Sequence, residues 1–578
     1  MCGISGSFGF NDAGDLERIK VMNHAIRHRG PDAGGAKLIS SEVGAIGHVR
    51  LSIIDVSERS NQPFSNQQQN VFICFNGEVI NASELKAEIA YDFATTSDTE
   101  VILAGYLQEG DSFFEKMTGM FAILLVDLRI NKVKLIRDCF GIKPLWYAVR
   151  NGALAISSEE RAFAAIGWSE KNRDFGKWYL GFRYCPSIEG RLKKSRKVKP
   201  GHIYEWSIGT HYGEPSISHF MNAHSDQQVN EVNEAELLED LDWRFTKAVD
   251  QWSVSDVPVT SFLSSGIDSA LVVDSLWRAG HNLSAYTACF NIENYSEQEA
   301  VSRFCKRRGI ESQIRMIGKK DFMMNYEKYA KNRSGLVGVA NEIAIGMLTE
   351  NVADRFKVVF SGEGADELFG GYGRLFRYPE QFSSSVEDFR VSDEFVLGFV
   401  QKYNYVKNSQ SWLTFGWEKH ESEQDFAQFL SEALQSKFAH GWISEFFQTV
   451  HLPGLLERLD AATMSSSVEG RPVFLHQELW HWVNAKVPRS MKLKWHQNCH
   501  PNQLVKQAAS TYSGVWDTPK FLLRELAKKR LSPDESRIQK IGFPVPVREW
   551  MVGSGAKEVD GASDAEFWLV NTLMQNES

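Results

Sequence analysis

The sequence lacks the features that mark secreted, membrane-spanning and nucleic-acid-binding proteins. Its seven cysteines are scattered over 578 residues without any CxxC pair, so we expect a reducing compartment and neither a disulfide framework nor a zinc site. No uncharged apolar run approaches the roughly 18 residues that predict a membrane span, and no secretory signal is visible at the start. The net charge of −9 leaves no basic surface for nucleic acid or a membrane. We therefore expect a cytoplasmic globular protein.

The length predicts more than one domain, because 578 residues exceed what a single hydrophobic core usually supports. Residues 1–205 are rich in short β-like runs separated by turn residues, with helical patterns at 15–28 and 99–108. Residues 206–235 are polar and weakly periodic, which favours a linker. Residues 236–578 contain short continuous apolar runs followed by Gly-rich turns and helical segments, which is typical of buried parallel strands in an α/β domain.

The first segment, MCGISGSFGF, places a cysteine directly after the initiator methionine. If Met1 is removed, Cys2 carries a thiol and an α-amine on the same carbon. The α-amine has an ordinary pKa of about 7.7–8.0, so it can accept the thiol proton directly or through one water. Such a residue is a candidate nucleophile that needs no separate histidine.

Four further motifs follow Cys2 in order: RHRGPD (27–32), HVRLSIID (48–55), FNGEVIN (75–81) and TTSDTEVIL (95–103). Together with CGI they resemble the class II, N-terminal-nucleophile (Ntn) glutamine amidotransferases. The resemblance implies that Cys2 attacks the side-chain amide of glutamine. It also implies that Asn76 and the Gly77 N–H form the oxyanion hole, and that glutamine itself is bound by Arg50, Asn76, Glu78 and Asp98.

A second motif, VPVTSFLSSGIDSALVVDSL (257–276), has the pattern of a strand, a loop of small residues and a helix. Backbone N–H groups at a helix N-terminus favour phosphate, although the Gly-Lys-Ser/Thr ending of a Walker A loop is missing. The loop resembles the pyrophosphate loop of N-type ATP pyrophosphatases, with Ser265 replacing the first glycine of a Gly-Gly pair. The resemblance implies ATP and pyrophosphate contacts at Leu263, Ser264, Ser265, Gly266, Asp268 and Ser269.

The segment FKVVFSGEGADELFGGYGR (356–374) is again a strand followed by a Gly-rich acidic loop, and it resembles asparagine synthetase. The resemblance implies that Asp268 and Asp366 hold Mg²⁺ through the carboxylate oxygens that this ion prefers. It implies that Glu363 handles protons on the incoming ammonia and that Ser361 and Gly362 lie near the nucleotide. In QKIGFPVPVREW (539–550), Lys540 falls where the family has a lysine that neutralises the departing pyrophosphate.

The resemblance to glutamine-dependent asparagine synthetases runs from Cys2 to about Trp550. It implies a multidomain α/β protein: an Ntn-type α/β/β/α sandwich over 1–205, a linker over 206–235, and a doubly wound parallel-sheet synthetase domain over 236–578. The implied reaction amidates a carboxylate, aspartate first, with glutamine as nitrogen donor, ATP and Mg²⁺ as cofactors, and an acyl-adenylate as intermediate. A homodimer is expected because family members are often dimers.

The sequence departs from the plainest family pattern at Ser265, at His476 in place of an aspartate, and in an apparent insertion at 495–518. Because His476 and this insertion lie in the C-terminal region expected to shape the acceptor pocket, two alternatives stay open. The same chemistry could act on another carboxylate, such as a uronic acid in surface-polysaccharide assembly. A catalytically inactive scaffold or regulatory protein on this fold is the second alternative, although Cys2, Asp268 and Asp366 are all present.

Overall fold

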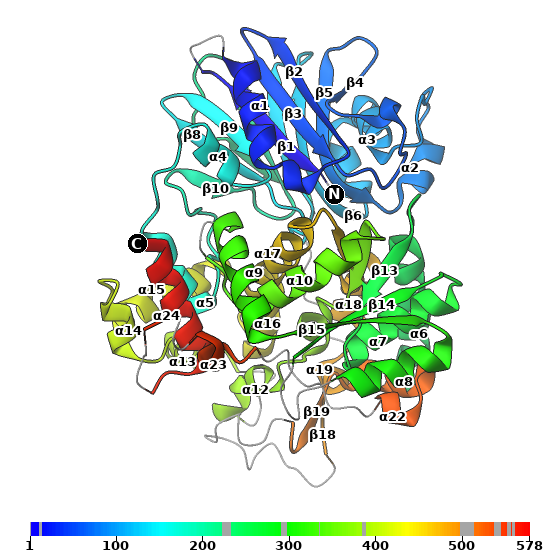
Figure 1. Cartoon of the computed structure of the whole chain (residues 1–578), viewed down its shortest axis with the longest axis vertical. Coiled ribbons are helices and arrows are strands. Elements are labelled where there is room, and N and C mark those ends of the chain that lie inside the picture. The colour runs from blue at the N-terminus through cyan, green and yellow to red at the C-terminus, as the bar shows by residue number, and fades with distance from the viewer. Residues whose placement is uncertain are drawn as a thin grey trace.

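The computed structural model of the chain describes residues 2–10, 14–221, 233–290, 297–333, 336–383, 389–496, 514–536, 545–551, 556–557 and 561–577. A strand-rich N-terminal part, blue to cyan in Figure 1, packs on a larger C-terminal part that is richer in helices. This arrangement confirms the predicted multidomain α/β class.

The N-terminal part contains two six-stranded antiparallel sheets. The first sheet has the spatial order β10 (Ser195–Lys197), β8 (Trp146–Arg150), β9 (Ala153–Ser157), β1 (Gly3–Phe8), β3 (Gly44–Arg50), β2 (Ala33–Ser40). The second has the order β12 (Ser216–His219), β11 (His202–Ser207), β7 (Lys132–Arg137), β6 (Gly119–Asp127), β5 (Val71–Val79), β4 (Phe64–Ser65).

The two sheets face each other across a buried apolar layer that includes Ile4 and Ile156 from the first sheet and Leu124 and Leu135 from the second. Helices cover the outer faces: α1 (Asp15–Ala25) and α4 (Arg161–Ala165) pack on the first sheet, and α2 (Ala82–Glu88) and α3 (Asp98–Glu109) on the second. The result is the predicted α/β/β/α sandwich, because each sheet has two apolar faces to bury.

Two segments pack differently from what the sequence pattern indicates. Strand β12 lies inside 206–235, the stretch for which a linker was predicted, and pairs with β11 from His202↔His219 to Glu205↔Ser216. Helix α5 (Asp174–Phe182) lies inside 1–205, yet its buried residues Tyr179, Leu180 and Phe182 belong to a core of the C-terminal part. The division of the chain at 205 and 235 stays a prediction.

The C-terminal part is built on a five-stranded parallel sheet. Its spatial order is β15 (Glu311–Ile317), β14 (Ser284–Phe290), β13 (Val259–Phe262), β16 (Val358–Ser361), β17 (Glu469–Pro472). The chain therefore moves outward in one direction from β13 and then in the other from β16. Such a doubly wound sheet has a switch point between β13 and β16, where the loops at the carboxyl ends of the two strands diverge and ligands usually bind.

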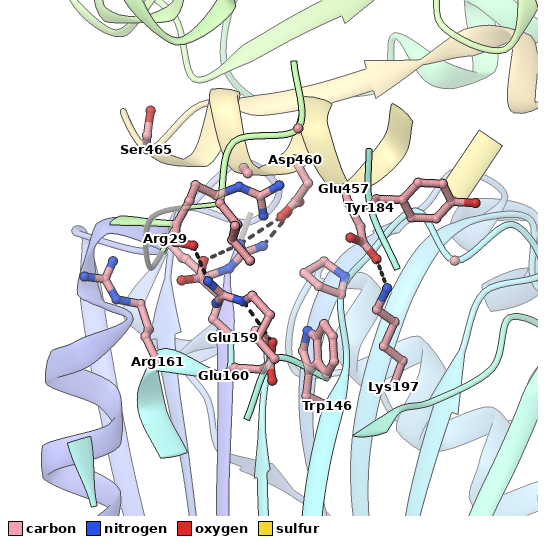
Figure 2. Close-up of a pocket in the computed structure, with 18 of the residues that line it drawn as sticks. Arg29, Trp146, Glu159, Glu160, Arg161, Tyr184, Lys197, Glu457, Asp460 and Ser465 are labelled. Carbon is pink, nitrogen blue, oxygen red and sulfur yellow. Dashed lines mark hydrogen bonds and ion pairs between the residues drawn. The ribbon is translucent and has the colours of Figure 1, made fainter. Parts of the chain in front are cut away.

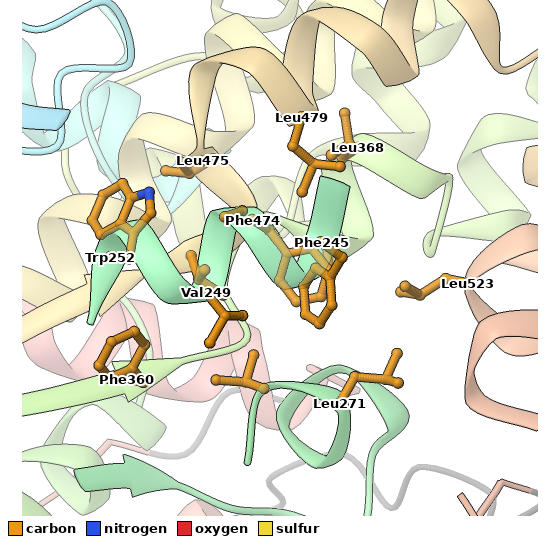
Figure 3. Packing of buried hydrophobic residues seen from close by; sticks show 14 of the residues in the cluster. Phe245, Val249, Trp252, Leu271, Phe360, Leu368, Phe474, Leu475, Leu479 and Leu523 are labelled. Atoms are coloured by element: carbon orange, nitrogen blue, oxygen red, sulfur yellow. The ribbon is translucent and has the colours of Figure 1, made fainter. Parts of the chain in front are cut away.

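Helix α6 (Glu234–Trp252) shows how sequence pattern builds this core. Asn233 caps it by accepting a hydrogen bond from Ala235 N at 3.0 Å, and Leu237, Leu241, Phe245 and Trp252 recur at helical spacing on its buried face. Phe245, Val249 and Trp252 project into the apolar cluster shown in Figure 3.

The remaining helices surround the parallel sheet or extend from it. Their bounds are α7 (Ile267–Arg278), α8 (Gln298–Arg308), α9 (Lys319–Asn332), α10 (Asn341–Ala353), α11 (Ala365–Phe369), α12 (Gly373–Phe376), α13 (Asp393–Tyr403), α14 (Ser409–Leu413), α15 (Lys419–Ala433), α16 (Ala439–Glu445), α17 (Leu452–Met464), α18 (Gln477–Lys486), α19 (Arg489–Lys492), α21 (Phe521–Arg530), α22 (Pro533–Ser536), α23 (Val547–Met551) and α24 (Asp564–Glu577). Among the residues that the structure describes, no helix combines the length and apolar character needed to cross a bilayer.

Candidate functional site

Cys2 lies at the start of β1 in a small pocket at the edge of the sandwich. Arg50, Gly77, Glu78 and Asp98 also line this pocket. The Cys2 backbone N–H donates to Asn76 Oδ1 at 2.9 Å, and burial raises the pKa of the Cys2 thiol. The structure thus brings together the glutamine-site residues that the sequence singled out.

Asn76 and Gly77 lie on β5, where Asn76 contacts Cys2. Asn76 is fully buried, and its Nδ2 has no hydrogen-bond partner among the described residues. A buried amide N–H without a partner costs free energy, which a developing oxyanion would recover. Position 77 tolerates only glycine, because a Cβ there would lie 2.0 Å from the carbonyl oxygen of Met120.

Arg50 lines the pocket, but the loop that follows β3 uses much of its hydrogen-bonding capacity. Its Nη1 donates to Ser57 O and to Asn61 Oδ1, each at 2.8 Å, and its Nη2 donates to Ile54 O at 3.2 Å and to the carbonyl oxygen of Asp55. The guanidinium therefore shapes the rim of the pocket besides carrying its positive charge.

Glu78 and Asp98 supply two buried carboxylates on the other side of the pocket. Burial raises the pKa of Asp98 to about 6. Hydrogen bonds from the backbone N–H groups of Val79 and Thr99 favour the ionised carboxylate and oppose this rise. Burial also raises the pKa of Glu78 well above its usual range, although the nearby Arg471 opposes this shift. A cationic ammonium group would restore the charged forms of both carboxylates.

The C-terminal part completes this pocket from β17. Glu469 is among the residues that line it, and Arg471 pairs with Glu469 at 2.7 Å and with Glu78 at 3.3 Å. The sequence motifs did not indicate this contact between β17 and the glutamine pocket. The only available signal was a charged Glu-Gly-Arg run inside an otherwise buried strand.

The second predicted site lies at the switch point of the parallel sheet. The loop after β13 folds on itself, with Ser264 N donating to Ser269 Oγ at 3.0 Å and Gly266 N donating to Ser264 Oγ at 3.2 Å. The loop after β16 approaches closely, because a Cβ on Gly362 would lie 3.0 Å from Asp268 Cβ. Ser361 and Gly362 therefore face the N-terminus of α7, where backbone N–H groups favour phosphate.

Lys520 joins the two carboxylates that were predicted to hold magnesium. Its Nζ lies 2.8 Å from Asp268 Oδ2 and 2.6 Å from Asp366 Oδ1, and its backbone adopts the left-handed region with φ of 55°. Such strain in a non-glycine residue is typical of functional sites. No sequence motif indicated a role for Lys520.

The acidic loop after β16 continues into a buried network. Glu363 forms an ion pair with Arg458 of α17. Glu367 accepts a hydrogen bond from Tyr372 OH at 2.7 Å. Burial, with the neighbouring Asp366 and Glu363, raises the pKa of Glu367 to about 8, so this carboxyl is protonated at neutral pH.

Three residues flagged by the sequence have distinct outcomes. Lys540 lies outside the described residues. Ser265 keeps φ outside the left-handed region and donates from Oγ to Glu297 Oε1 at 2.7 Å, so it fits the loop. His476 stands at the N-cap of α18, where its Nδ1 accepts from Leu479 N at 3.4 Å and its Nε2 lies 2.7 Å from Gln251 Oε1. Of the apparent insertion at 495–518, residues 497–513 also lie outside the described residues; β18 (Leu493–Trp495) and β19 (Asp517–Pro519) pair at its base.

Comparisons with known proteins match two family profiles to successive parts of the chain. The profile described as a glutamine amidotransferase domain matches residues 1–215, and the one described as asparagine synthase matches residues 240–564. Asparagine synthetase [glutamine-hydrolyzing] 1 of Bacillus subtilis is 28% identical, over 95% of this chain and 88% of the relative.

Other relatives carry a different name or match only in part. Amidase chry2 of Gibberella zeae is 30% identical over 62% of this chain and 55% of the relative. Among solved structures, the glutamine phosphoribosylpyrophosphate amidotransferase from B. subtilis matches with a TM-score of 0.31 and 16% identity, over 55% of this chain and 91% of that chain.

Proposed function

The chain belongs to the asparagine synthase family and carries a glutamine amidotransferase domain, so it is a glutamine-dependent ligase; from this premise we propose that it amidates aspartate to asparagine. One observation carries the proposal: a single chain combines a pocket built around Cys2 and Asn76 with a carboxylate–lysine cluster at the switch point of a parallel sheet.

In the first half-reaction, the Cys2 thiolate attacks the side-chain amide of glutamine. The free α-amine of Cys2 takes the thiol proton, and Asn76 Nδ2 with the Gly77 N–H stabilises the oxyanion. Arg50 attracts the α-carboxylate of glutamine, and Glu78 and Asp98 attract its ammonium group. Ammonia leaves, and water then hydrolyses the thioester to give glutamate.

In the second half-reaction, the acceptor carboxylate attacks the α-phosphorus of ATP. An acyl-adenylate forms and pyrophosphate departs, with Ser264, Ser265, Gly266 and Ser269 around the phosphates and Ser361 and Gly362 near the nucleotide. Ammonia then displaces AMP to give the amide. Lys520 and Lys540 supply positive charge for the departing pyrophosphate, and Glu363 accepts a proton from the attacking ammonia.

The residues of this site also suit magnesium. Asp268 and Asp366 converge on the single ammonium of Lys520, so their oxygens already form a place where a cation is favourable, and Mg²⁺ prefers such hard ligands. Mg²⁺ held by Asp268 and Asp366 would neutralise charge on the β- and γ-phosphates. The described residues contain no cluster of three or more His, Cys, Asp or Glu side chains suited to a metal, which agrees with an ion held jointly by protein and phosphate.

The test measures asparagine formed from aspartate and ATP, with either glutamine or ammonium as nitrogen donor. We expect Cys2→Ala to lose the glutamine-dependent reaction and to keep the ammonium-dependent one. Cys305→Ala, which changes a buried cysteine on α8, is the matched control and should keep both. If Cys2→Ala uses glutamine as well as the wild type does, the first half-reaction is wrong.

A second candidate keeps the chemistry and changes the acceptor. It is favoured by relatives named amidases, chry2 and chyE, and by His476 at a position where the family has an aspartate. Pyrophosphate release with aspartate, compared with a panel of sugar acids and amino acids, separates the two candidates, because the true acceptor gives the highest kcat/KM.

A further inference from the structure

A cavity lies between the two parts of the chain, apart from both sites described above. One wall comes from the N-terminal sandwich, including Arg29, Trp146 and Arg161, and the opposite wall comes from α17, including Glu457 and Asp460 (Figure 2). None of the phosphate-loop residues, Glu363 or Cys2 lines it.

The charges of the lining do not balance. Seven arginine and lysine residues line the cavity, against four aspartate and glutamate residues. All four acids are already paired. Their ion pairs are Glu159–Arg29 at 2.8 Å, Asp460–Arg29 at 2.9 Å, Glu160–Arg191 at 3.3 Å, and Glu457–Lys197. The acids therefore neutralise Arg29, Arg191 and Lys197 and leave the other cations of the lining without a carboxylate inside the cavity.

Of the four remaining cations, Arg333 pairs with Glu342 outside the cavity at 2.8 Å, and three arginines carry the surplus charge. Arg137 is 5% exposed and donates only to the carbonyl oxygens of Lys143, Val198 and Gly141, at 2.7–2.8 Å. Arg183 stacks on the Tyr405 ring at 3.4 Å, and the nearest partner of Arg161 is His28 Nδ1 at 3.4 Å. Among the described residues, none of these three has an acidic partner.

A buried cation that forms no ion pair is costly, and burial lowers the pKa of Arg137, although the nearby Asp138, Glu457 and Asp460 oppose this shift. An anion in the cavity would remove this cost, and guanidinium groups bind carboxylate and phosphate oxygens in pairs. Trp146 and Tyr184 add apolar faces to the same cavity. We propose that the cavity is a binding site for a small organic anion that bears carboxylate or phosphate groups.

The position of Arg29 gives the bound anion a route to the glutamine pocket. Arg29 lines the cavity, and its Nε donates to the carbonyl oxygen of Cys2 at 3.1 Å. Because Arg29 is already paired with Glu159 and Asp460, an anion bound by the other arginines acts on Cys2 by disturbing these two ion pairs, and with them the Arg29–Cys2 hydrogen bond. This consequence rests on the proposed function, since it requires Cys2 to be the nucleophile, whereas binding of the anion does not.

The binding test is calorimetric titration of the full chain with citrate and, separately, with phenyl phosphate, without magnesium because citrate chelates it. We expect saturable binding of at least one probe, weakened at least 10-fold in Arg183→Gln and in Arg161→Gln. Arg303→Gln, which changes an exposed arginine on α8, should bind as the wild type does. The probe should raise the melting temperature of the wild type and Arg303→Gln more than that of Arg183→Gln and Arg161→Gln. The melting curve without probe also shows whether each variant is folded.

Absence of binding by both probes, equal binding by all variants, or displacement of the probe by ATP would overturn the proposed site. A second readout tests the consequence for Cys2. Glutamine hydrolysis by the wild type should change at least threefold at saturating probe, and Arg183→Gln should not respond at that concentration. Unchanged hydrolysis with the probe bound would overturn the coupling, while loss of all glutaminase activity without probe would instead count against the proposed function.

Discussion

Arg29 and Asp460, which are 431 positions apart in the chain, form a buried ion pair between the N-terminal sandwich and helix α17. Nη1 lies 2.9 Å from Oδ2 and Nη2 lies 3.3 Å from Oδ1, and the same guanidinium donates from Nε to the carbonyl of Cys2. One side chain therefore fixes the residue proposed as the nucleophile relative to the part that carries the synthetase site.

We expect Asp460→Asn to lower the free energy of unfolding by about 3 kcal/mol, because it removes one partner of a buried ion pair. Glutamine-dependent product formation should fall more than the ammonium-dependent reaction, since the contact lies beside Cys2. Thermal melting and the two activity assays measure these effects. Asp425→Asn, which breaks an exposed pair with Lys177, is the control; equal melting of the two variants would contradict the prediction.

We expect Lys520→Met to slow ATP-dependent pyrophosphate release by about 100-fold or more, because it removes a preorganised cation from the phosphate site. Glutaminase activity should stay within twofold of the wild-type value. Lys528→Met, which changes an exposed lysine on α21, should leave both activities unchanged. A Lys520→Met variant that is folded and releases pyrophosphate at the wild-type rate would remove Lys520 from the proposed site.

The stability of the chain should depend on the protonation of Glu367, because its pKa rises from 4.5 to about 8 on folding. The folded state keeps a proton that the unfolded state releases above pH 4.5, so stability falls by about 1.4 kcal/mol per pH unit between pH 4.5 and 8. Glu367→Gln keeps an acceptor for Tyr372 and carries no proton to lose. It should be more stable than the wild type at pH 7, by up to about 3 kcal/mol.

The measurement for this prediction is the melting temperature between pH 5 and 8, with Glu394→Gln, at an exposed position on α13, as the control. The difference between Glu367→Gln and the wild type should grow with pH. A difference that stays constant over this range would show that Glu367 is ionised throughout.

The buried imidazole of His48 should make the folded chain less stable in acid. It is fully buried, its Nε2 lies 2.9 Å from the carbonyl oxygen of Phe75, and burial lowers its pKa from 6.5 to about 3. Below pH 6.5 the unfolded chain takes up a proton that the folded chain does not, so each such histidine costs about 1.4 kcal/mol per pH unit.

His48→Gln should remove one histidine's share of this acid sensitivity, because a glutamine amide can still donate to Phe75 O and does not titrate. Melting at pH 7 and pH 5 measures the difference, and His24→Gln, at an exposed position on α1, is the control. The prediction is contradicted if the wild type and His48→Gln lose the same stability between these two pH values.

Much of the fold follows from patterns within short segments. The strands of both antiparallel sheets begin within the β-rich region predicted over 1–205, apart from β12, and α1 and α3 lie where helical periodicity places them. The two apolar runs before Gly-rich loops are the parallel strands β13 and β16. Such patterns can be read because strand and helix periodicity depends on residues two to four positions apart.

Contacts between residues far apart in the chain could not be predicted from these local patterns. The sequence predicted a shared magnesium ion for Asp268 and Asp366, but it gave no sign that both carboxylates also meet Lys520, which is 252 positions from Asp268. It placed residues 174–182 with the N-terminal domain, whereas α5 packs in the C-terminal core. It also gave no sign that Glu469 lines the glutamine pocket.

The sequence by itself determined the kinds of elements, their order and the residue types available for amide and phosphate chemistry, because these depend on neighbours along the chain. Only the tertiary structure decided which charged groups share a buried space. That choice depends on the packing of the whole chain, since burying a charge is tolerated only where a distant segment supplies its counter-charge or hydrogen bond.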